Sequence, residues 1–265
     1  MMDEKLRMKN KGMCVKWLLV PVLLAFLTTV SAQQYTGMSG LIHVPSADMD
    51  DAGEVRIGAH FLNREFLPVV FDCQGRYHTT DHYLSITPFS WIELGYTCTL
   101  QKGSKGAGSD PNDIGFYHKD RYFSIKIRPL KEDKWWPSIA IGSNDPITTS
   151  GNAKRDDLPE RTKNQIFGNI YIAATKHIDC ARHSIGFHLA YRKWKRSYNN
   201  QWNGLVGGIT YQPSFAPDLR VIAEYTGDDT NIGADCLLWK HLLLQASLQN
   251  GKYFSGGICF QMNLF

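Results

Sequence analysis

The sequence lacks several features that would identify common classes of protein. Outside residues 17–30, no window approaches the roughly 18 apolar residues that a membrane-spanning helix needs. No GxSxG elbow and no His-Asp-Ser-Asn-Gly type of run occurs, so the motifs give catalysis little support. The cysteines form no CxxC pair and no Cys/His ligand spacing, so neither a metal site nor any other bound cofactor is expected.

Positive charge is also scarce once the amino-terminal segment is set aside. The 265-residue chain has a formal net charge of +4. Residues 1–32 carry five positive and two negative charges, so the net charge of residues 33–265 is only +1. A chain so nearly neutral has no broad basic surface, and no nucleic-acid partner is expected. We interpret the cysteines of this part as apolar fillers, with any disulfide pairing left open: Cys73, Cys98, Cys180, Cys236 and Cys259.

The amino-terminal residues have the pattern of an export signal. Basic residues from Lys5 to Lys16 precede an apolar stretch over 17–30, and Ser31-Ala32 provide a small-residue cleavage site. The alternative is a transmembrane anchor, but this stretch is shorter than the roughly 20 residues that a spanning helix needs. We therefore predict a signal peptide over 1–32. Cys14 precedes the apolar stretch, so a lipoprotein anchor is not expected.

Segments of alternating polarity dominate the rest of the chain. Residues 55–61, 123–128, 184–192 and 219–225 each alternate apolar with polar or small side chains. Such segments are typical of strands that meet an apolar medium on one side and a polar one on the other. Leu243 breaks the polar face of its segment. About twelve strands are expected, beginning near residues 53, 78, 90, 120, 136, 164, 182, 202, 217, 231, 241 and 252.

The connections between these strands alternate in length. The long ones are 64–77, 101–119, 144–163 and 193–201, and the short ones are 88–90, 131–134, 179–181, 214–217 and 239–240. An outer-membrane barrel with both termini in the periplasm has this asymmetry, because its periplasmic turns are tight and its surface loops are long. Asn250-Gly251 predicts a type I′ hairpin turn.

A soluble periplasmic β-sandwich is the competing fold, since its strands also alternate. Aromatic residues near the expected strand ends favour the barrel, because interfacial girdles need amphipathic rings. The last strand also ends on an aromatic residue, as outer-membrane barrels commonly do, although Phe265 falls on the polar parity. The aromatic residues in question are Trp91, Tyr96, Trp135, Trp136, Tyr171, Tyr191, Tyr211, Tyr225, Trp239, Tyr253 and Phe265. The expected fold is all-β: an antiparallel transmembrane β-barrel over 53–265, with residues 33–52 as a plug in its lumen.

Four blocks, in order, carry a resemblance to a known family. Residues 40–47 and 53–58 resemble the opening motif of the YjbH-like proteins, a family of bacterial outer-membrane proteins associated with exopolysaccharide production. Residues 85–95, 120–145 and 223–233 are similar to later blocks of the same family. The motif residues in the opening block are Gly40, Pro45, Ala47, Gly53 and Gly58. The resemblance implies a barrel in the bacterial outer membrane that takes part in exopolysaccharide or capsule production or export.

Charged residues of both signs are expected to face the lumen. In one interpretation acids and bases pair across strands and fill a polar interior. In the other, Arg56, Lys126, Arg128 and Arg220, with Glu224, contact acidic glycan, because guanidinium groups match carboxylates. The full set of lumen-facing candidates is Arg56, His60, Glu93, Lys126, Arg128, His188, Arg192, Arg220, Glu224 and Asp235.

The expected function is that of a non-enzymatic envelope component, with a general porin or structural barrel as the alternative. The expected partners are outer-membrane lipid, the barrel-assembly machinery at the last strand, and polysaccharide or periplasmic export proteins. Two clusters of ionisable residues, 78–82 and 227–229, are interpreted as a strand start and a turn rather than as a hydrolase site. Four histidines are isolated in the sequence, which is the further reason to expect no metal site: His43, His118, His177 and His183.

Overall fold

A computed structural model describes residues 33–68, 70, 75–105, 110, 112–149, 151, 157–180 and 183–265. The predicted signal peptide and Cys73 lie outside these residues. Within the described ranges, no helix is both long enough and apolar enough to cross a membrane. The helical elements there are short 3-10 turns in the connections: η2 (Arg64–Phe66), η4 (Glu160–Thr162) and η5 (Ser197–Trp202).

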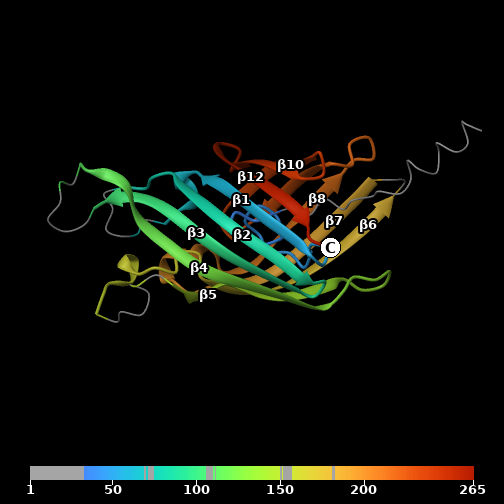
Figure 1. Ribbon diagram of the computed structural model, residues 1–265, viewed down its shortest axis with the longest axis horizontal. Coiled ribbons are helices and arrows are strands. Elements are labelled where there is room, and N and C mark those ends of the chain that lie inside the picture. The colour runs from blue at the N-terminus through green and yellow to red at the C-terminus, as the bar shows by residue number, and fades with distance from the viewer. Residues whose placement is uncertain are drawn as a thin grey trace, which may run out of the picture.

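Strands make up the body of the molecule (Figure 1). The described residues form twelve, in agreement with the number expected from the sequence. They are β1 (Glu54–Leu62), β2 (Thr79–Phe89), β3 (Ile92–Ser104), β4 (Ile114–Leu130), β5 (Ser138–Thr148), β6 (Asn169–Cys180), β7 (His183–Trp194), β8 (Gly204–Gln212), β9 (Leu219–Tyr225), β10 (Thr230–Leu238), β11 (Leu242–Gln249) and β12 (Tyr253–Asn263).

The sheet closes on itself. Each strand pairs antiparallel with its neighbours in sequence, and β1 pairs with β12 from Glu54↔Asn263 to Phe61↔Gly256. A closed sheet has no unpaired edge strand, so neighbouring strands supply backbone hydrogen-bond partners to one another, as lipid requires. The fold is therefore the predicted antiparallel barrel, and the β-sandwich alternative is wrong.

The two ends of the barrel differ. The connections β2–β3, β4–β5, β6–β7, β8–β9 and β10–β11 lie at one end, called here the turn end, and the carboxy-terminus lies there too (Figure 1). The opposite end, called the loop end, carries the longer connections β1–β2, β3–β4, β5–β6 and β7–β8. The predicted alternation of short and long connections is thus confirmed.

Two strand boundaries differ from the prediction. β4 begins at Ile114 instead of near residue 120, because β3 and β4 continue pairing up to Ser104↔Ile114. The connection between them is therefore shorter than the predicted 101–119. This extension of the two strands is rich in glycine and polar residues and has no amphipathic period. β6 begins at Asn169 instead of near residue 164, because Gln165 adopts a positive φ of 75° and begins a turn that the Gly168 N–H closes at 3.1 Å. A backbone in that region cannot extend a strand.

The outside of the barrel is apolar, as a lipid-facing surface must be. Outward side chains at mid-strand positions include Ile57, Ile172 and Ile258, each at least half exposed. Large aromatic rings mark the turn end, where Trp91, Trp135 and Trp239 are exposed. The predicted girdle role is wrong for Tyr171, whose side chain points inward and is buried at 3% exposure.

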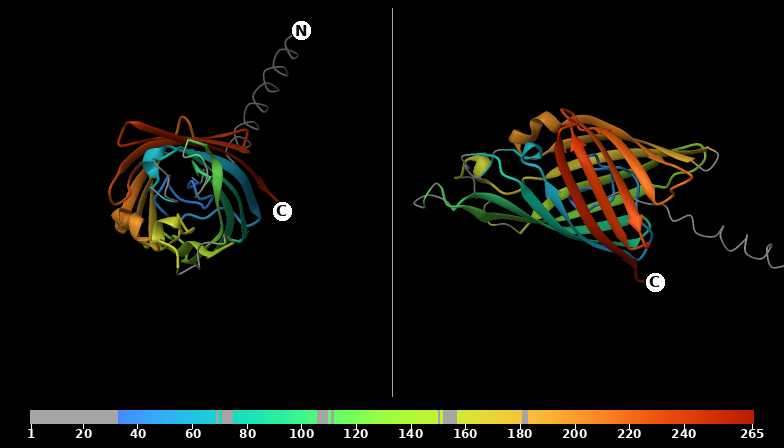
Figure 2. Two further views of the ribbon diagram at one scale, coloured as in Figure 1. Left: turned by 90° about the vertical axis from the view of Figure 1, so that its left-hand side faces the viewer. Right: turned by 90° about the horizontal axis from the view of Figure 1, so that it is seen from above.

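The inside of the barrel is filled by the amino-terminal segment. Seen along the barrel axis, the coil that follows residue 33 lies inside the ring of strands (Figure 2). Residues 33–47 are buried throughout. Leu41, Ile42, Val44 and Ala47 pack against inward apolar side chains of the wall, including Tyr171 and Ile222. We call residues 33–47 the plug, and its presence confirms the expectation that this segment enters the lumen.

Candidate functional site: the plugged lumen

The plug is a short compact chain with little regular structure of its own. Isolated bridges join Gln33 to Ser39 and Gly40 to Pro45, and Leu41 N–H donates to the Val44 carbonyl at 3.0 Å. The family motif 40–47 therefore forms a tight turn deep in the lumen. Several other backbone groups of the plug bond to the wall, since a buried backbone group needs a partner. The wall side chains provide these partners.

Glu224 on β9 holds the tip of the plug. Its carboxylate accepts the backbone N–H groups of Ile42, His43 and Val44 at 3.1, 2.8 and 3.0 Å. Asn231 on β10 donates to the same carboxylate at 2.6 Å. Charged acceptors form stronger hydrogen bonds than neutral ones, so one side chain fixes three consecutive residues of the turn.

Arg192 on β7 also holds this turn, as a positively charged hydrogen-bond donor where Glu224 is a negatively charged acceptor. Its Nη1 donates to the His43 carbonyl at 2.7 Å, and its Nη2 donates to the Thr226 carbonyl at 3.2 Å. The guanidinium also lies 4.9 Å from the Trp194 ring centroid, in a cation–π contact. Burial, together with the nearby Arg192 charge, holds the pKa of the His43 imidazole well below its ordinary value. The His43 imidazole is therefore neutral at physiological pH, which lies above this lowered pKa.

Glu93 on β3 and Lys126 on β4 form a second anchor. Their side chains are fully buried and paired at 3.1 Å. Ser39 N–H donates to Glu93 at 2.7 Å, and Lys126 Nζ donates to the Ser39 carbonyl at 2.8 Å and contacts the Ser39 hydroxyl. The ion pair therefore satisfies both backbone groups of one plug residue.

The other predicted lumen residues occupy different surroundings. Arg56 pairs with Asp50 just beyond the plug at 2.7 Å, and both are buried. Arg220 pairs with Asp235 across β9 and β10, also at 2.8 Å and buried. Arg128 is only half buried and donates to the Ser90 carbonyl at 2.7 Å at the turn end. The structure thus brings Lys126 and Glu224 to the plug, brings Arg56 to the segment that follows it, and leaves Arg220 and Arg128 apart.

Two family-motif glycines are explained by their surroundings. Gly53 has a φ of 86°, a left-handed conformation that favours glycine, at the bend from the plug segment into β1. Gly58 on β1 lies beneath the Tyr83 ring, and a Cβ there would collide with the Tyr83 hydroxyl. Tyr83 in turn donates to the Gln33 side chain at 3.1 Å. Another small motif residue, Ala47, is buried and donates its N–H to Thr175 Oγ1 at 3.0 Å.

The loop end is covered by a separate apolar cluster. Tyr35 of the plug packs there with Phe66 and Leu67 of the β1–β2 connection, Phe167 before β6 and Trp202 of η5. Leu243, which interrupts the alternation of its strand, belongs to a third buried cluster with Tyr83, Leu237 and Cys259. The break in polarity is therefore an inward apolar contact.

A pocket of about 240 Å³ opens at the turn end. Its lining includes Asp51 and Glu54 from the start of β1, Lys240 and His241 from the β10–β11 turn, and Asn263 at the end of β12. The lining therefore carries both charge signs.

Sequence reasoning missed several plug contacts. Ser39, Thr97 and Gln245 each form a hydrogen bond between plug and wall, Thr97 Oγ1 to the Thr36 carbonyl at 2.7 Å and Gln245 Nε2 to the Gln33 carbonyl at 3.1 Å. Inward parity could have identified Thr97 and Gln245, but the plug has no periodicity that would have identified Ser39. His177 is also not isolated, because it lies beside Asp48 at 3.7 Å.

The two clusters of ionisable residues, 78–82 and 227–229, lie at the start of a strand and in a turn. Asp229 lies in a turn in which Thr226 N–H donates to its carbonyl at 2.9 Å, and its carboxylate accepts from Trp202 and Asn250. Asp81 follows Thr79 on the inward face at the start of β2 and is fully buried. These positions match the turn and the strand start expected from the sequence.

These features define a class: a twelve-stranded membrane β-barrel whose lumen is occupied by its own amino-terminal segment. The family model described as exopolysaccharide biosynthesis protein YbjH matches residues 32–265, and the chain belongs to this YjbH family. The family expected from the sequence motifs is confirmed.

Comparison with curated proteins gives no match. Among solved structures, outer membrane phospholipase A from Escherichia coli is similar at 11% identity and a TM-score of 0.32, covering 82% of this chain and 98% of that one. The Salmonella typhi outer membrane phospholipase dimer with bound calcium is similar at 11% identity and a TM-score of 0.34, covering 80% and 90%. Likenesses at this level assign neither activity nor site residues to this chain.

Proposed function

We propose that the chain is a non-enzymatic outer-membrane barrel that takes part in exopolysaccharide production or export, with its lumen held closed by the plug. The family match over residues 32–265 is the observation that carries this proposal. The apolar exterior, the aromatic residues at the turn end and the asymmetric connections support placement in the outer membrane with the turn end in the periplasm.

The plug favours this proposal over the alternative of a general porin. An open porin needs a water-filled lumen. Here Glu224, Arg192 and the Glu93–Lys126 pair hold the plug through charged hydrogen bonds across the lumen. Passage of a polymer would therefore require displacement of the plug, for which the pocket at the turn end offers a periplasmic partner a point of attachment.

The absence of catalysis is likewise proposed on the positions of the ionisable groups. Glu93, Lys126 and Glu224 are occupied by hydrogen bonds to the plug, and Asp229 by a turn. A general acid or base must reach a substrate proton within hydrogen-bond distance. Side chains already bound to the protein's own backbone are poorly placed for that role.

The glycan-contact hypothesis is sharpest at Arg128. Contact of polymer with Arg56, Lys126, Arg220 or Glu224 requires that their present partners move away first. Arg128 is half buried at the turn end and is the member of this set most accessible to a polymer arriving from the periplasm.

The proposal is tested in a bacterium that produces the polymer and carries this gene. Deletion should lower secreted or surface polysaccharide, and the wild-type gene should restore it. Arg128→Glu should restore less polymer at an equal amount of folded barrel in the outer membrane, because the reversed charge repels an acidic glycan. A matched reversal on a loop, Arg64→Glu, should restore normal output. Unchanged polymer on deletion would refute the proposed function, and full restoration by Arg128→Glu would refute only the glycan contact.

A further inference from the structure

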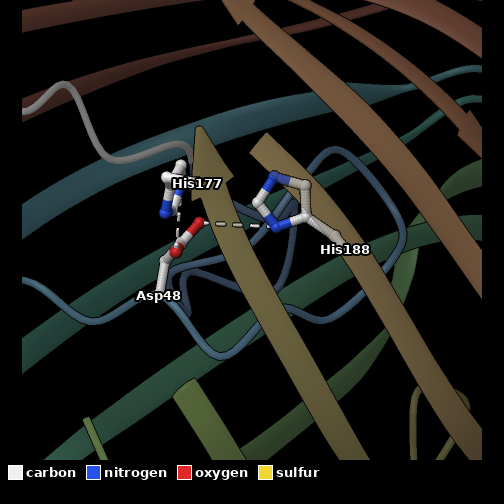
Figure 3. A group of neighbouring side chains, drawn as sticks. All are labelled: Asp48, His177 and His188. Atoms are coloured by element: carbon white, nitrogen blue, oxygen red, sulfur yellow. Dashed lines mark ion pairs between the residues drawn. The ribbon is translucent and has the colours of Figure 1, made fainter. Parts of the chain in front are cut away.

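Three side chains from separate segments converge near the turn end. Asp48 follows the plug, His177 lies near the end of β6, and His188 lies on the neighbouring strand β7 (Figure 3). Their potential ligand atoms lie within 4.8 Å of one another. Asp48 Oδ1 is 3.7 Å from His177 Nε2, and Asp48 Oδ2 is 3.6 Å from His188 Nδ1.

These separations suit a shared cation better than direct hydrogen bonds. An N–H···O bond has a donor–acceptor distance of about 2.7–3.2 Å, and both contacts exceed it. Two ligands that bind zinc at about 2.0–2.1 Å in a tetrahedral arrangement lie about 3.3 Å apart. Because the three ligand atoms lie within 4.8 Å of one another, movements of about an ångström would bring all three groups to bonding distance of one ion.

His177 is oriented with a lone pair toward Asp48. Its Nδ1 lies 2.8 Å from Glu132 Oε2, in the β4–β5 connection. A carboxylate only accepts, so the ring proton resides on Nδ1 and Nε2 carries the lone pair. Glu132 is itself fixed by Lys176 Nζ and by the backbone N–H of His177, both at 2.7 Å. A carboxylate behind a ligating imidazole is the usual outer-shell support of a metal-bound histidine.

His188 is held on both ring edges. Thr175 Oγ1 lies 3.1 Å from Nδ1, and Thr210 Oγ1 lies 3.0 Å from Nε2. The same Thr175 oxygen accepts the Ala47 N–H at 3.0 Å, so the residue before Asp48 is attached to the ring's partner. Nδ1 is the ring atom that faces Asp48, and an ion bound there would take the place of the Thr175 hydroxyl.

The three groups differ in their access to solvent. The His188 side chain is fully buried, Asp48 is 14% exposed and His177 is 34% exposed. An ion can therefore enter past His177 from the turn end, and a fourth ligand position can be filled by water.

We propose that Asp48, His177 and His188 bind a divalent late first-row transition-metal ion, with zinc as the reference case. Two imidazole nitrogens and one carboxylate oxygen are ligands typical of such ions, whereas calcium and magnesium prefer oxygen alone. Only Asp48 comes from the segment that follows the plug, while both histidines belong to the wall. The ion therefore fastens the plug's exit to β6 and β7.

The direct test is metal binding by the full folded barrel in detergent. After treatment with a chelator and dialysis, wild-type protein titrated with ZnCl₂ should bind one zinc per chain, and Co²⁺ should show the visible absorption of a low-symmetry nitrogen and oxygen site. Equal concentrations of Ca²⁺ or Mg²⁺ should not compete. Failure to bind zinc, or equal competition by Ca²⁺, would overturn the proposal.

Matched variants assign the ligands. His177→Ala and Asp48→Asn should each weaken zinc binding at least tenfold, and Glu132→Gln should weaken it roughly tenfold through the second shell. His183→Ala, which removes a histidine at the start of β7, should bind as the wild type does. His177 and Glu132 are partly exposed at the rim, so these two variants keep the test valid if a buried substitution fails to fold. Unchanged affinity in both His177→Ala and Asp48→Asn would refute the site.

A second readout tests the fastening of the plug. Zinc should slow amide hydrogen exchange at residues 47–50 in the wild type and have no such effect in His177→Ala. Binding without slower exchange would leave the metal site standing and refute the fastening. Neither experiment depends on polysaccharide output, so the outcome is separate from that of the proposed function.

Discussion

Among the wall residues that contact residues 42–44, Glu224 accepts the largest number of hydrogen bonds from the plug. Its two oxygens receive three backbone N–H groups and one Asn231 amide. The backbone groups are buried, so removal of their acceptor leaves donors that water cannot easily reach. An unsatisfied buried polar group costs about 1–3 kcal/mol.

Glu224→Gln should therefore loosen the tip of the plug. The amide retains one acceptor oxygen but places an NH₂ group against backbone donors, so we expect a loss of about 2 kcal/mol. Amide hydrogen exchange at residues 42–44 should become about 30-fold faster, since 1.4 kcal/mol corresponds to a factor of ten. The control Glu65→Gln, on η2, should leave this exchange unchanged. Equal exchange in Glu224→Gln and wild type would show that the carboxylate does not hold the plug.

At the residue scale, the period-two pattern predicts which side chains face the lumen but does not predict the groups to which they bond. Arg56, Lys126, Arg220 and Glu224 all face inward, as the period-two pattern predicts. Pairing across strands accounts for Arg220 with Asp235, but the partners of Lys126 and Glu224 include plug backbone. Backbone groups are the same in every residue, so the sequence contains no signal for them. Asp48 and His177 likewise meet only through the path of the plug.

The Asn250-Gly251 turn adopts the conformation that its residue types predict. Asn250 and Gly251 have φ values of 50° and 67°, as a type I′ turn requires at its two central positions. Lys252 N–H donates to the Gln249 carbonyl at 3.0 Å and closes the turn. Trp239 and Lys240 adopt the same left-handed conformation at the β10–β11 turn, which their residue types do not predict.

Gly251→Ala should destabilise the barrel by about 1 kcal/mol. A Cβ at this position meets no atom within 4 Å, so the cost comes from the left-handed backbone alone. Gly151→Ala is the matched control, because its Cβ also enters open space and its backbone is not left-handed. Urea unfolding of the barrel in lipid vesicles, followed by tryptophan fluorescence, measures both. A loss for Gly151→Ala equal to that for Gly251→Ala would contradict the assignment of the cost to φ.

Two loop-end connections are joined by a pH-sensitive contact. Glu160 of η4 accepts the Ser197 N–H at 2.9 Å and the Ser197 hydroxyl at 2.5 Å. These hydrogen bonds lower the pKa of the Glu160 carboxyl below its ordinary value near 4.5. A depressed folded-state pKa means that the contact is fully present above the ordinary value and is lost as pH falls through the lowered one.

Acidification should therefore release η5 from η4. Amide exchange at Ser197, corrected for the intrinsic pH dependence of exchange, should show a growing loss of protection as the pH falls below about 4.5. Glu160→Gln removes the titrating group, so its residual protection should not vary over this range. A wild-type protection that stays constant from neutral pH to well below 4 would contradict the contact's role.

The elements that the sequence predicted best are those whose two faces meet different media. Amphipathic period identified twelve strands and the short connections, because each outward face meets lipid and each inward face meets polar groups. It failed for the extension in which residues 101–104 of β3 pair with residues 114–118 of β4, because that stretch has no amphipathic period. Tyr171 was misplaced for a related reason: an aromatic residue near a strand end can point inward over Gly142 as well as outward to the interface.

At the scale of the whole molecule, the plug converts a hollow cylinder into a packed one. Leu41, Ile42 and Val44 fill the middle of the lumen, and Tyr35 joins the cluster that covers the loop end. Four charged wall residues, which would line a wet channel without the plug, are instead partners of plug backbone: Glu93, Lys126, Arg192 and Glu224. A barrel of twelve strands lies between the filled eight-stranded barrels and the open porins, so the occupant of its lumen decides whether ions pass.

Conductance in planar bilayers therefore separates a plugged barrel from a porin. The wild-type protein should pass no steady current, because residues 33–47 occupy the lumen and are held by side chains from seven strands of the wall. These side chains are Tyr83, Glu93, Thr97, Lys126, Thr175, Arg192, Glu224 and Gln245. Deletion of residues 33–47 should produce stable current steps at an equal amount of inserted barrel, since water then solvates the charged wall. The point variant Glu65→Gln, which leaves the plug in place, should remain silent. Steady channels in the wild-type protein would show that the plug leaves a conducting path, and the porin alternative would then be the better description of this chain.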